Sequence, residues 1–157
     1  MRTGPREYED PNEILPEGFL ARTEGRGLIC GWAPEANILA HKSVGGFVTH
    51  CGWNSILESI WFGVPTATWP LYAEQQVNAF QMVKDLELAV ELKMDYRHGQ
   101  EALVSAAEVE NAVKLLMSVG LEMRKRVNKM SERSRAAVAK EGSSYETIGA
   151  LINKVLC

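Results

Sequence analysis

The stretch WAPEANILAHKSVGGFVTHCGWNSILESIWFGVPTATWPLYAEQ, Trp32–Gln75, decides the fold of this chain. Within it, the continuous apolar run Val44–Thr49 predicts a strand that is covered on both faces of a parallel sheet. The apolar spacing over Asn54–Phe62 predicts a helix, which the following Gly and Pro end. Thr66–Trp69 predicts another strand. A strand, a helix and a strand in this order indicate a parallel α/β arrangement.

Further elements are predicted on both sides of this stretch. They are a short buried strand at Gly27–Cys30, a brief helix at Pro34–Leu39, a helix at Ala73–Leu86 with Val77, Phe80, Val83 and Leu86 inward, a strand at Ala89–Leu92, a helix from the capping box Ser105-x-x-Glu108 to Met117, and helices over 121–141 and from Ser143 onward. The predicted fold class is therefore α/β, a Rossmann-like parallel sheet with flanking helices. Ligands of such sheets bind beyond the carboxyl ends of the strands.

The overall composition excludes several classes of function. The chain has 157 residues with 17 basic and 20 acidic side chains, and its net charge of −3 does not favour nucleic acid or an anionic membrane. The basic run Arg124–Arg126 is best explained as a solvated helix face. No apolar run approaches the roughly 18 residues of a spanning helix, so no stable membrane insertion is expected. Three widely spaced cysteines argue against a disulfide framework or a zinc site and favour the cytoplasm.

The segment HCGWNS, residues 50–55, connects the first predicted strand of the stretch to its helix. Gly52 allows a sharp turn, and the free N–H groups of the first helical turn favour an anion. Asn54 and Ser55 can add hydrogen bonds, and His50 can donate to a phosphate, so the segment suits a diphosphate without a metal. Two other interpretations stay open: Ser55-x-x-Glu58 fits a capping box equally well, and a lone His at a strand end is more often structural.

Two further groups in the stretch suit the other parts of a nucleotide sugar. Trp32, held by the nearby Pro34, offers a flat surface on which a base can stack. Glu74 and Gln75 place an acid beside an amide, which together supply acceptors and donors for sugar hydroxyls. Each has an ordinary alternative, since Trp32 can be a simple surface or core aromatic and Glu74 can complement a helix dipole.

Together these residues resemble the signature box of plant family 1 glycosyltransferases, which use UDP-sugars and adopt the GT-B fold. The match covers the whole stretch, and the flanks LPEGF, QVNAF and EGSSY are also similar to this family. The resemblance implies a carboxyl-terminal fragment, a partial C-terminal domain of a GT-B glycosyltransferase. It divides the chain into 1–26, an extended segment, 27–142, the donor-binding domain, and 143–157, a helix that would pack on the missing N-terminal domain.

The resemblance also implies a role for each donor-binding residue. These roles are Trp32 and the Ala33 backbone at uracil, Glu35 and Glu58 at the ribose hydroxyls, His50, Asn54 and Ser55 at the diphosphate, and Trp53, Glu74 and Gln75 at the transferred sugar. Gln75 tends to accompany glucose, so UDP-glucose is the expected donor, with no metal and no other cofactor. His41 and Cys51 are expected to be structural, Cys51 as a buried filler rather than a nucleophile.

The implied activity of the parent enzyme is transfer of glucose from UDP-glucose to a hydroxyl of a small plant metabolite, such as a flavonoid, with inversion. Family members take their catalytic His from the N-terminal domain, so no catalytic residue is expected in this chain, which is predicted to be inactive alone. The first alternative is a non-catalytic fragment or modulator that binds UDP-sugar, and the second is a remnant without function. A generic Rossmann domain is least favoured, because no GxGxxG follows a predicted strand.

One departure from the family pattern generates a prediction. The family usually has Gln where this chain has Glu35, and the carboxylate adds negative charge near a dianionic ligand while losing the amide donors. Glu35→Gln, introduced in a full-length protein, is expected to tighten UDP-sugar binding. Calorimetric titration of both forms measures the effect, and equal or weaker binding by the Gln form contradicts the prediction.

Overall fold

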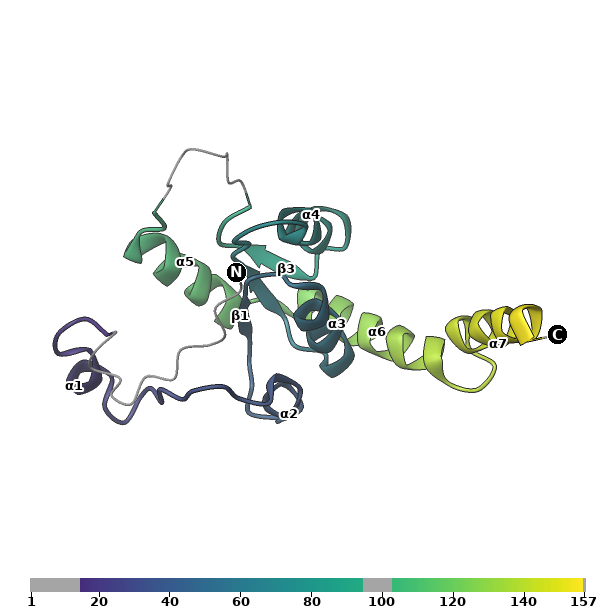
Figure 1. Ribbon diagram of the computed structural model, residues 1–157. Coiled ribbons are helices and arrows are strands. Elements are labelled where there is room, and N and C mark those ends of the chain that lie inside the picture. Colours follow the sequence, from purple (N-terminus) through teal and green to yellow (C-terminus); the bar gives the residue numbers. More distant parts are fainter. Residues whose placement is uncertain (1–14, 95–102, 157) are drawn as a thin grey trace. The chain divides into compact units, whose positions relative to one another are not determined.

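The computed structural model describes residues 15–94 and 103–156 (Figure 1). The chain divides into two compact units, Met1–Pro34 and Glu35–Cys157, and each is described by itself. None of the helices within the described residues is both long and apolar enough to cross a membrane.

The first unit contains one short helix, α1 (Phe19–Thr23), among its described residues. The buried strand predicted at Gly27–Cys30 is wrong, because this segment is neither extended in a sheet nor buried. Leu28 is 89% exposed and Ile29 is 41% exposed. A strand needs a neighbouring strand to satisfy its backbone groups, and the described residues of this unit offer none.

The second unit is built on a parallel sheet, as predicted. In the described residues it has three strands in the order β1-β2-β3, formed by Phe47–Thr49, Thr66–Thr68 and Ala89–Glu91. All neighbours are parallel, with Val48 paired to Ala67 and Ala67 to Val90. The strands are shorter than predicted, but they occupy the predicted places. Because they are parallel, their carboxyl ends meet at one edge of the sheet.

One helix precedes the first strand of the second unit, and helices follow each of its strands. They are α2 (Glu35–Leu39), α3 (Trp53–Phe62), α4 (Gln75–Phe80) continued by the π-helical segment η2 (Gln81–Asp85), α5 (Ala106–Met117), α6 (Leu121–Val138) and α7 (Ser143–Leu156). The predicted capping box of α5 is confirmed: the Ser105 hydroxyl accepts from the Glu108 N–H, and the Glu108 carboxylate accepts from the Ser105 N–H. These two hydrogen bonds satisfy backbone donors that a helix start otherwise leaves open.

The two faces of the sheet carry separate apolar cores, because successive side chains of a strand point to opposite faces. One core joins residues of α3, α4, η2 and α6 to Ala89 of β3. The other joins Ala67 and Val90 to Leu116 and Val119, at and beyond the end of α5. Figure 1 shows α5 on one side of the strands and α3 and α4 on the other. This two-sided cover explains why all three residues of the central strand β2 are buried.

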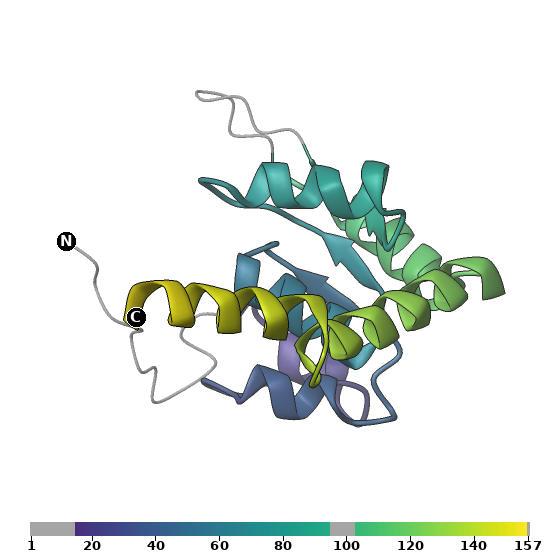
Figure 2. The same cartoon turned by 90° about the vertical axis from the view of Figure 1, so that its right-hand side faces the viewer.

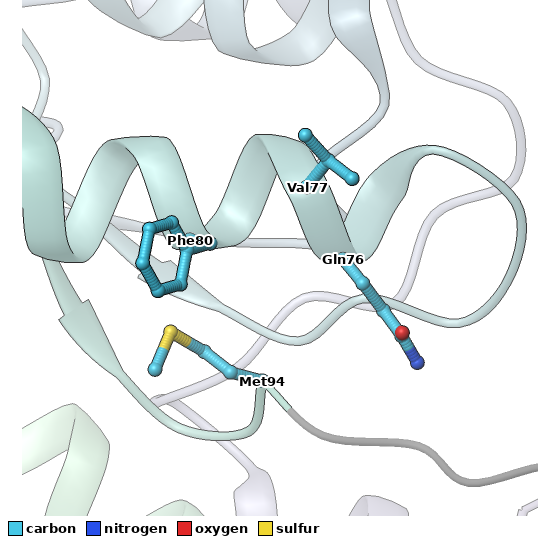
Figure 3. A pocket seen from close by; sticks show the side chains of 4 residues that line it. All are labelled: Gln76, Val77, Phe80 and Met94. Carbon is cyan, nitrogen blue, oxygen red and sulfur yellow. The ribbon is translucent and has the colours of Figure 1, made fainter.

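The inward face of α4 differs from the prediction. Val77 and Phe80 were expected to point inward, but they are 61% and 52% exposed. They lie on the outer side of the helix, where together with Gln76 and Met94 they line a shallow pocket (Figure 3). The buried side chains near the start of α4 are instead the polar Gln75 and Asn78. The reason is that both side chains bond to backbone groups of other segments, as described below.

The two ends of α3 are held in different ways. At its carboxyl end, Gly63 has φ 70° and closes the helix with hydrogen bonds to Ser59 and Ile60. The carbonyl oxygen of Trp61 accepts from Ser131 Oγ at 2.7 Å and from Arg135 Nη2 at 3.0 Å, both on α6. The Arg135 guanidinium also lies 5.0 Å from the centre of the Trp61 ring. A cation at this end of a helix interacts favourably with its dipole.

The last helix, α7, follows α6 and contacts it (Figure 2). Its apolar side chains Ile148, Leu151, Ile152 and Val155 are all about half exposed or more. They recur at helical spacing, which defines one apolar face on an amphipathic helix. The described residues therefore do not bury the face that the sequence predicts to be inward.

Candidate functional site

The candidate site lies at the carboxyl-end edge of the sheet, where the loops after β1 and β2 meet. The backbone N–H of Trp69, just after β2, donates to the carbonyl of Thr49 at the end of β1, at 2.8 Å. This bond extends the pairing of the two strands by one step. It brings the segment that starts at His50 close to the segment that leads to Glu74 and Gln75.

The turn from β1 into α3 is formed by Cys51 rather than by Gly52. Cys51 has φ 63°, in the left-handed region that favours glycine, whereas Gly52 has φ −61°. The expectation that Gly52 supplies the unusual turn conformation is therefore wrong. Cys51 is fully buried, and its N–H donates to Thr49 Oγ1 at 3.1 Å. Burial raises the pKa of the Cys51 thiol to about 11, so it stays protonated at neutral pH and fits the predicted role of a buried filler.

Gly52 instead leaves room for the close approach of the His50 ring. A Cβ atom added at Gly52 would lie 2.5 Å from Nε2 of His50, so the ring occupies that space. Gly52 is also the residue that precedes the first turn of α3. The exposed His50 ring therefore lies against the start of the helix, where it can donate a hydrogen bond to a bound anion.

The start of α3 has no side-chain cap. The helix begins at Trp53, so Ser55 stands inside its first turn, and the N-cap residue, Gly52, has no side chain that could cap the helix. The alternative that Ser55 and Glu58 form a capping box is therefore not realised. Backbone N–H groups of the first turn, which a helix cannot satisfy by itself, lie at the positive end of the helix dipole. Asn54 is exposed beside them and Ser55 is 6% exposed.

Glu35 begins α2, which packs against α3. Its Oε1 atom is buried and has no hydrogen-bond partner within the described part of the chain. Glu58, on α3, is half-buried. A buried carboxylate oxygen without a donor is costly, and hydroxyl groups of a bound polyol are donors that satisfy it.

Gln75 has a structural role that fixes the orientation of its amide. The backbone N–H groups of Leu71 and Tyr72 donate to Gln75 Oε1 at 2.9 and 3.1 Å, and Gln75 is 3% exposed. Since only the carbonyl oxygen can accept, the NH2 group must point the other way. Within the described residues the loop uses the oxygen alone. Glu74, which precedes it, is exposed at the start of α4.

Not all of the predicted site residues belong to one unit. Trp32 and Ala33 lie in the first unit, where Trp32 is 89% exposed. The second unit brings His50, Trp53, Asn54, Ser55, Glu74 and Gln75 to the edge of the sheet, near the starts of α3 and α4. Glu58 lies further along α3, and Glu35 lies on α2, which packs against α3. His41 makes a hydrogen bond within its own loop, in which its Nδ1 accepts from the Ser43 N–H at 3.2 Å.

Sequence reasoning missed one residue of the site, Asn78. Its Nδ2 donates to the carbonyl oxygen of Cys51 at 3.0 Å, which ties α4 to the turn before α3. The signal in the sequence was a polar residue at a helical position between residues expected to face inward. Polar residues at such positions are usually assigned to the solvent side, so the pattern predicted that Asn78 would be exposed.

Metal-ligand chemistry has no evident place in the part of the chain that the structure describes. No group of three or more His, Cys, Asp or Glu side chains there has the arrangement of a metal site. The charge of a bound anion would instead meet the α3 N-terminus and the His50 ring.

Comparison with protein families identifies the sequence pattern behind this geometry. The profile of the UDP-glucoronosyl and UDP-glucosyl transferase family matches residues 13–132. UDP-glycosyltransferase 43 of Pueraria montana var. lobata is 59% identical over 151 residues, 96% of this chain and 32% of that protein. The flavonol 3-O-glucosyltransferase UGT71C4 of Arabidopsis thaliana is 56% identical over 144 residues, 92% of this chain and 30% of that protein. The chain thus spans about a third of the length of these relatives.

Solved structures with the same fold are equally similar. UGT71G1 of Medicago truncatula, complexed with UDP-glucose, is 51% identical with a TM-score of 0.86 over 93% of this chain and 32% of that one. A transferase of Siraitia grosvenorii, in complex with UDP, is 47% identical with a TM-score of 0.88 over 96% of this chain and 35% of that one. The predicted GT-B relationship of the sheet and its helices is therefore confirmed.

Proposed function

The chain belongs to the UDP-glucoronosyl and UDP-glucosyl transferase family, and we propose that the carboxyl-end edge of its sheet binds a UDP-sugar donor. The diphosphate would lie at the start of α3, between the first-turn N–H groups and the His50 ring. Asn54 and Ser55 would add side-chain hydrogen bonds. Charge on the diphosphate is met by the helix dipole and His50, so the proposed site requires no metal.

The uncapped start of α3 is the observation that carries this proposal. A helix start of this kind, without a side-chain cap, ordinarily takes a ligand or water. The His50 ring that lies against Gly52 at the same point adds a hydrogen-bond donor. Two relatives of similar fold, complexed with UDP-glucose and with UDP, support a nucleoside diphosphate as the anion.

The nucleoside end of the donor is assigned to residues before α3 and to Glu58 on α3. We place the ribose at Glu35 and Glu58, because the buried Glu35 oxygen lacks a donor that a ribose hydroxyl would supply. We place uracil on the exposed Trp32 ring, with the Ala33 backbone at its edge. Base stacking on an aromatic ring contributes about 1–3 kcal/mol per base.

The transferred sugar is assigned to Trp53, Glu74 and Gln75. The Gln75 NH2 group points away from the loop that holds its oxygen, and the exposed Glu74 carboxylate supplies acceptors. We propose glucose as the sugar, in keeping with the UDP-glucose bound to a relative of similar fold.

In the whole enzyme, this site would hold the donor while a small hydroxylated acceptor, such as a flavonol, attacks. The acceptor oxygen would form a bond to the anomeric carbon as the bond to the UDP oxygen breaks, which inverts the configuration. A general base would take the acceptor proton. The first turn of α3 would stabilise the charge that builds on the leaving diphosphate. We place the enzyme in the cytoplasm, where the described free thiols Cys30 and Cys51 stay reduced.

A second candidate, a non-catalytic UDP-sugar-binding module, is favoured by the lack of a suitable base among the described residues. The His41 ring is bonded within its own loop, and the His50 ring lies at the proposed diphosphate. Neither is placed to deprotonate an acceptor. Glucose transfer by the purified chain would exclude this candidate, whereas binding without transfer would support it.

Calorimetric titration of the purified chain with UDP-glucose tests the proposed function. We expect saturable binding that Trp32→Ala weakens about tenfold or more, because stacking on the base is lost. Leu28→Ala is the matched control, since Leu28 and Trp32 are both apolar and both 89% exposed in the same unit. Absence of binding, or equal loss in both variants, would contradict the proposal.

The sugar end of the site is tested by Gln75→Glu. Glutamate keeps an oxygen for the Leu71 and Tyr72 N–H groups but has no NH2 group to donate to a sugar hydroxyl. We expect affinity for UDP-glucose to fall roughly five- to tenfold relative to affinity for UDP, as for one lost hydrogen bond. Gln76→Glu adds the same charge one residue away and is expected to change both affinities equally. An unchanged ratio for Gln75→Glu would remove Gln75 from the sugar site.

A further inference from the structure

The side chain of Asn78 connects the two segments that carry the site. Asn78 lies one turn into α4, where it is 7% exposed. Its Nδ2 donates to the carbonyl oxygen of Cys51 at 3.0 Å, across 27 positions of the sequence. On one side of this bond are His50 and the start of α3, and on the other are Glu74 and Gln75.

The carbonyl that Asn78 binds belongs to the most constrained residue of the turn. A non-glycine residue with positive φ, such as Cys51 at 63°, persists only where its surroundings hold it. Its N–H donates to Thr49 Oγ1 at 3.1 Å, and its Sγ lies 3.5 Å from the Thr49 carbonyl oxygen. Those two contacts come from β1 itself. The bond from Asn78 comes from another element, so it also fixes where the turn stands relative to α4.

We infer that Asn78 is a positioning residue for the donor site, which rests on the proposed function of that site. By holding the Cys51 carbonyl, it sets the distance between the α3 start, where the diphosphate binds, and the α4 start, where the sugar binds. A nucleotide sugar spans both places, so its affinity depends on that distance. UDP without the sugar engages the first place alone and is less sensitive.

The alternative is that Asn78 merely satisfies a buried carbonyl and contributes only stability. Ser131 provides the control, because its Oγ also donates from a buried side chain to a backbone carbonyl at one end of α3. That bond, to Trp61 at 2.7 Å, lies at the opposite end of the helix from the donor site. Removing either bond should destabilise the chain, but only the bond of Asn78 should affect how the sugar is held.

The test compares Asn78→Ala with Ser131→Ala at a temperature where circular dichroism shows both to be folded. We expect Asn78→Ala to weaken UDP-glucose binding about tenfold and UDP binding less, since misplaced groups lose affinity for the ligand that spans them. Ser131→Ala is expected to stay within about twofold for both ligands. If Asn78→Ala fails to fold, Asn78→Leu removes the donor while filling the space. An equal, small effect of the folded Asn78 variant on UDP and UDP-glucose would overturn the inference.

A double-mutant cycle that combines Gln75→Glu with Asn78→Ala gives a second measurement. The coupling between the two substitutions in UDP-glucose affinity would be absent if Asn78 had a purely structural role. If Asn78 positions α4, Gln75→Glu has less effect on UDP-glucose affinity in the Asn78→Ala background than in the unsubstituted chain. Additive effects of the two substitutions would argue against positioning.

Hydrogen exchange separates this inference from the proposed function. Without any ligand, Asn78→Ala should speed exchange of the Cys51 and Ile56 backbone N–H groups, which bond to Thr49 Oγ1 and to the Gly52 carbonyl. Ser131→Ala should change these two rates less. If the unsubstituted chain does not bind UDP-glucose, the proposed function fails, and exchange still decides whether Asn78 holds the turn. Equal rates in the two variants would show that it does not.

Discussion

The left-handed conformation of Cys51, between β1 and α3, is the constraint on which the proposed donor site depends. It turns the chain sharply enough for α3 to begin three residues after the strand ends, with its first-turn N–H groups facing the edge of the sheet. The conformation is unfavourable for a residue with a side chain, and the burial and hydrogen bonds around Cys51 offset its cost. Backbone strain of this kind is common where a turn must orient several hydrogen-bonding groups toward one ligand.

The remainder of the second unit holds α3 at its other end and along its side. Ser131 and Arg135 of α6 bond the last carbonyls of α3, while Ile56 packs in the core below the sheet. Both ends of the helix are therefore fixed, but by different means. The carboxyl end is closed by side chains of α6, and the amino end is left open toward a ligand. A helix with one closed and one open end has its dipole available where the anion binds.

The sequence was a good guide where local signals decide the structure. Continuous apolar runs located the strands, Gly63 and Pro65 marked the end of α3, and Ser105 with Glu108 marked the start of α5. The positions of the site residues followed from the same pattern, because parallel strands place their following loops at one edge. The assignment of each residue to a part of the donor rested on the family resemblance and remains a proposal.

The predictions failed where a side chain has a particular partner that the apolar pattern does not reveal. Apolar spacing placed Val77 and Phe80 inward, yet Gln75 and Asn78 are buried because they bond the backbone of residues 71–72 and of Cys51. The apolar run Gly27–Cys30 lacks a neighbouring strand and stays out of the sheet. At the turn, glycine was assigned the strained conformation that Cys51 adopts, whereas Gly52 makes room for the His50 ring.

The central claim is that the open start of α3 binds a diphosphate, and it is tested most directly by nuclear magnetic resonance of the 15N-labelled chain titrated with UDP. The claim predicts that the backbone N–H signals of Trp53, Asn54 and Ser55 shift most with UDP and hardly at all with uridine, which lacks phosphate. Signals of these residues that stay in place with UDP, or that shift equally with uridine, would contradict it.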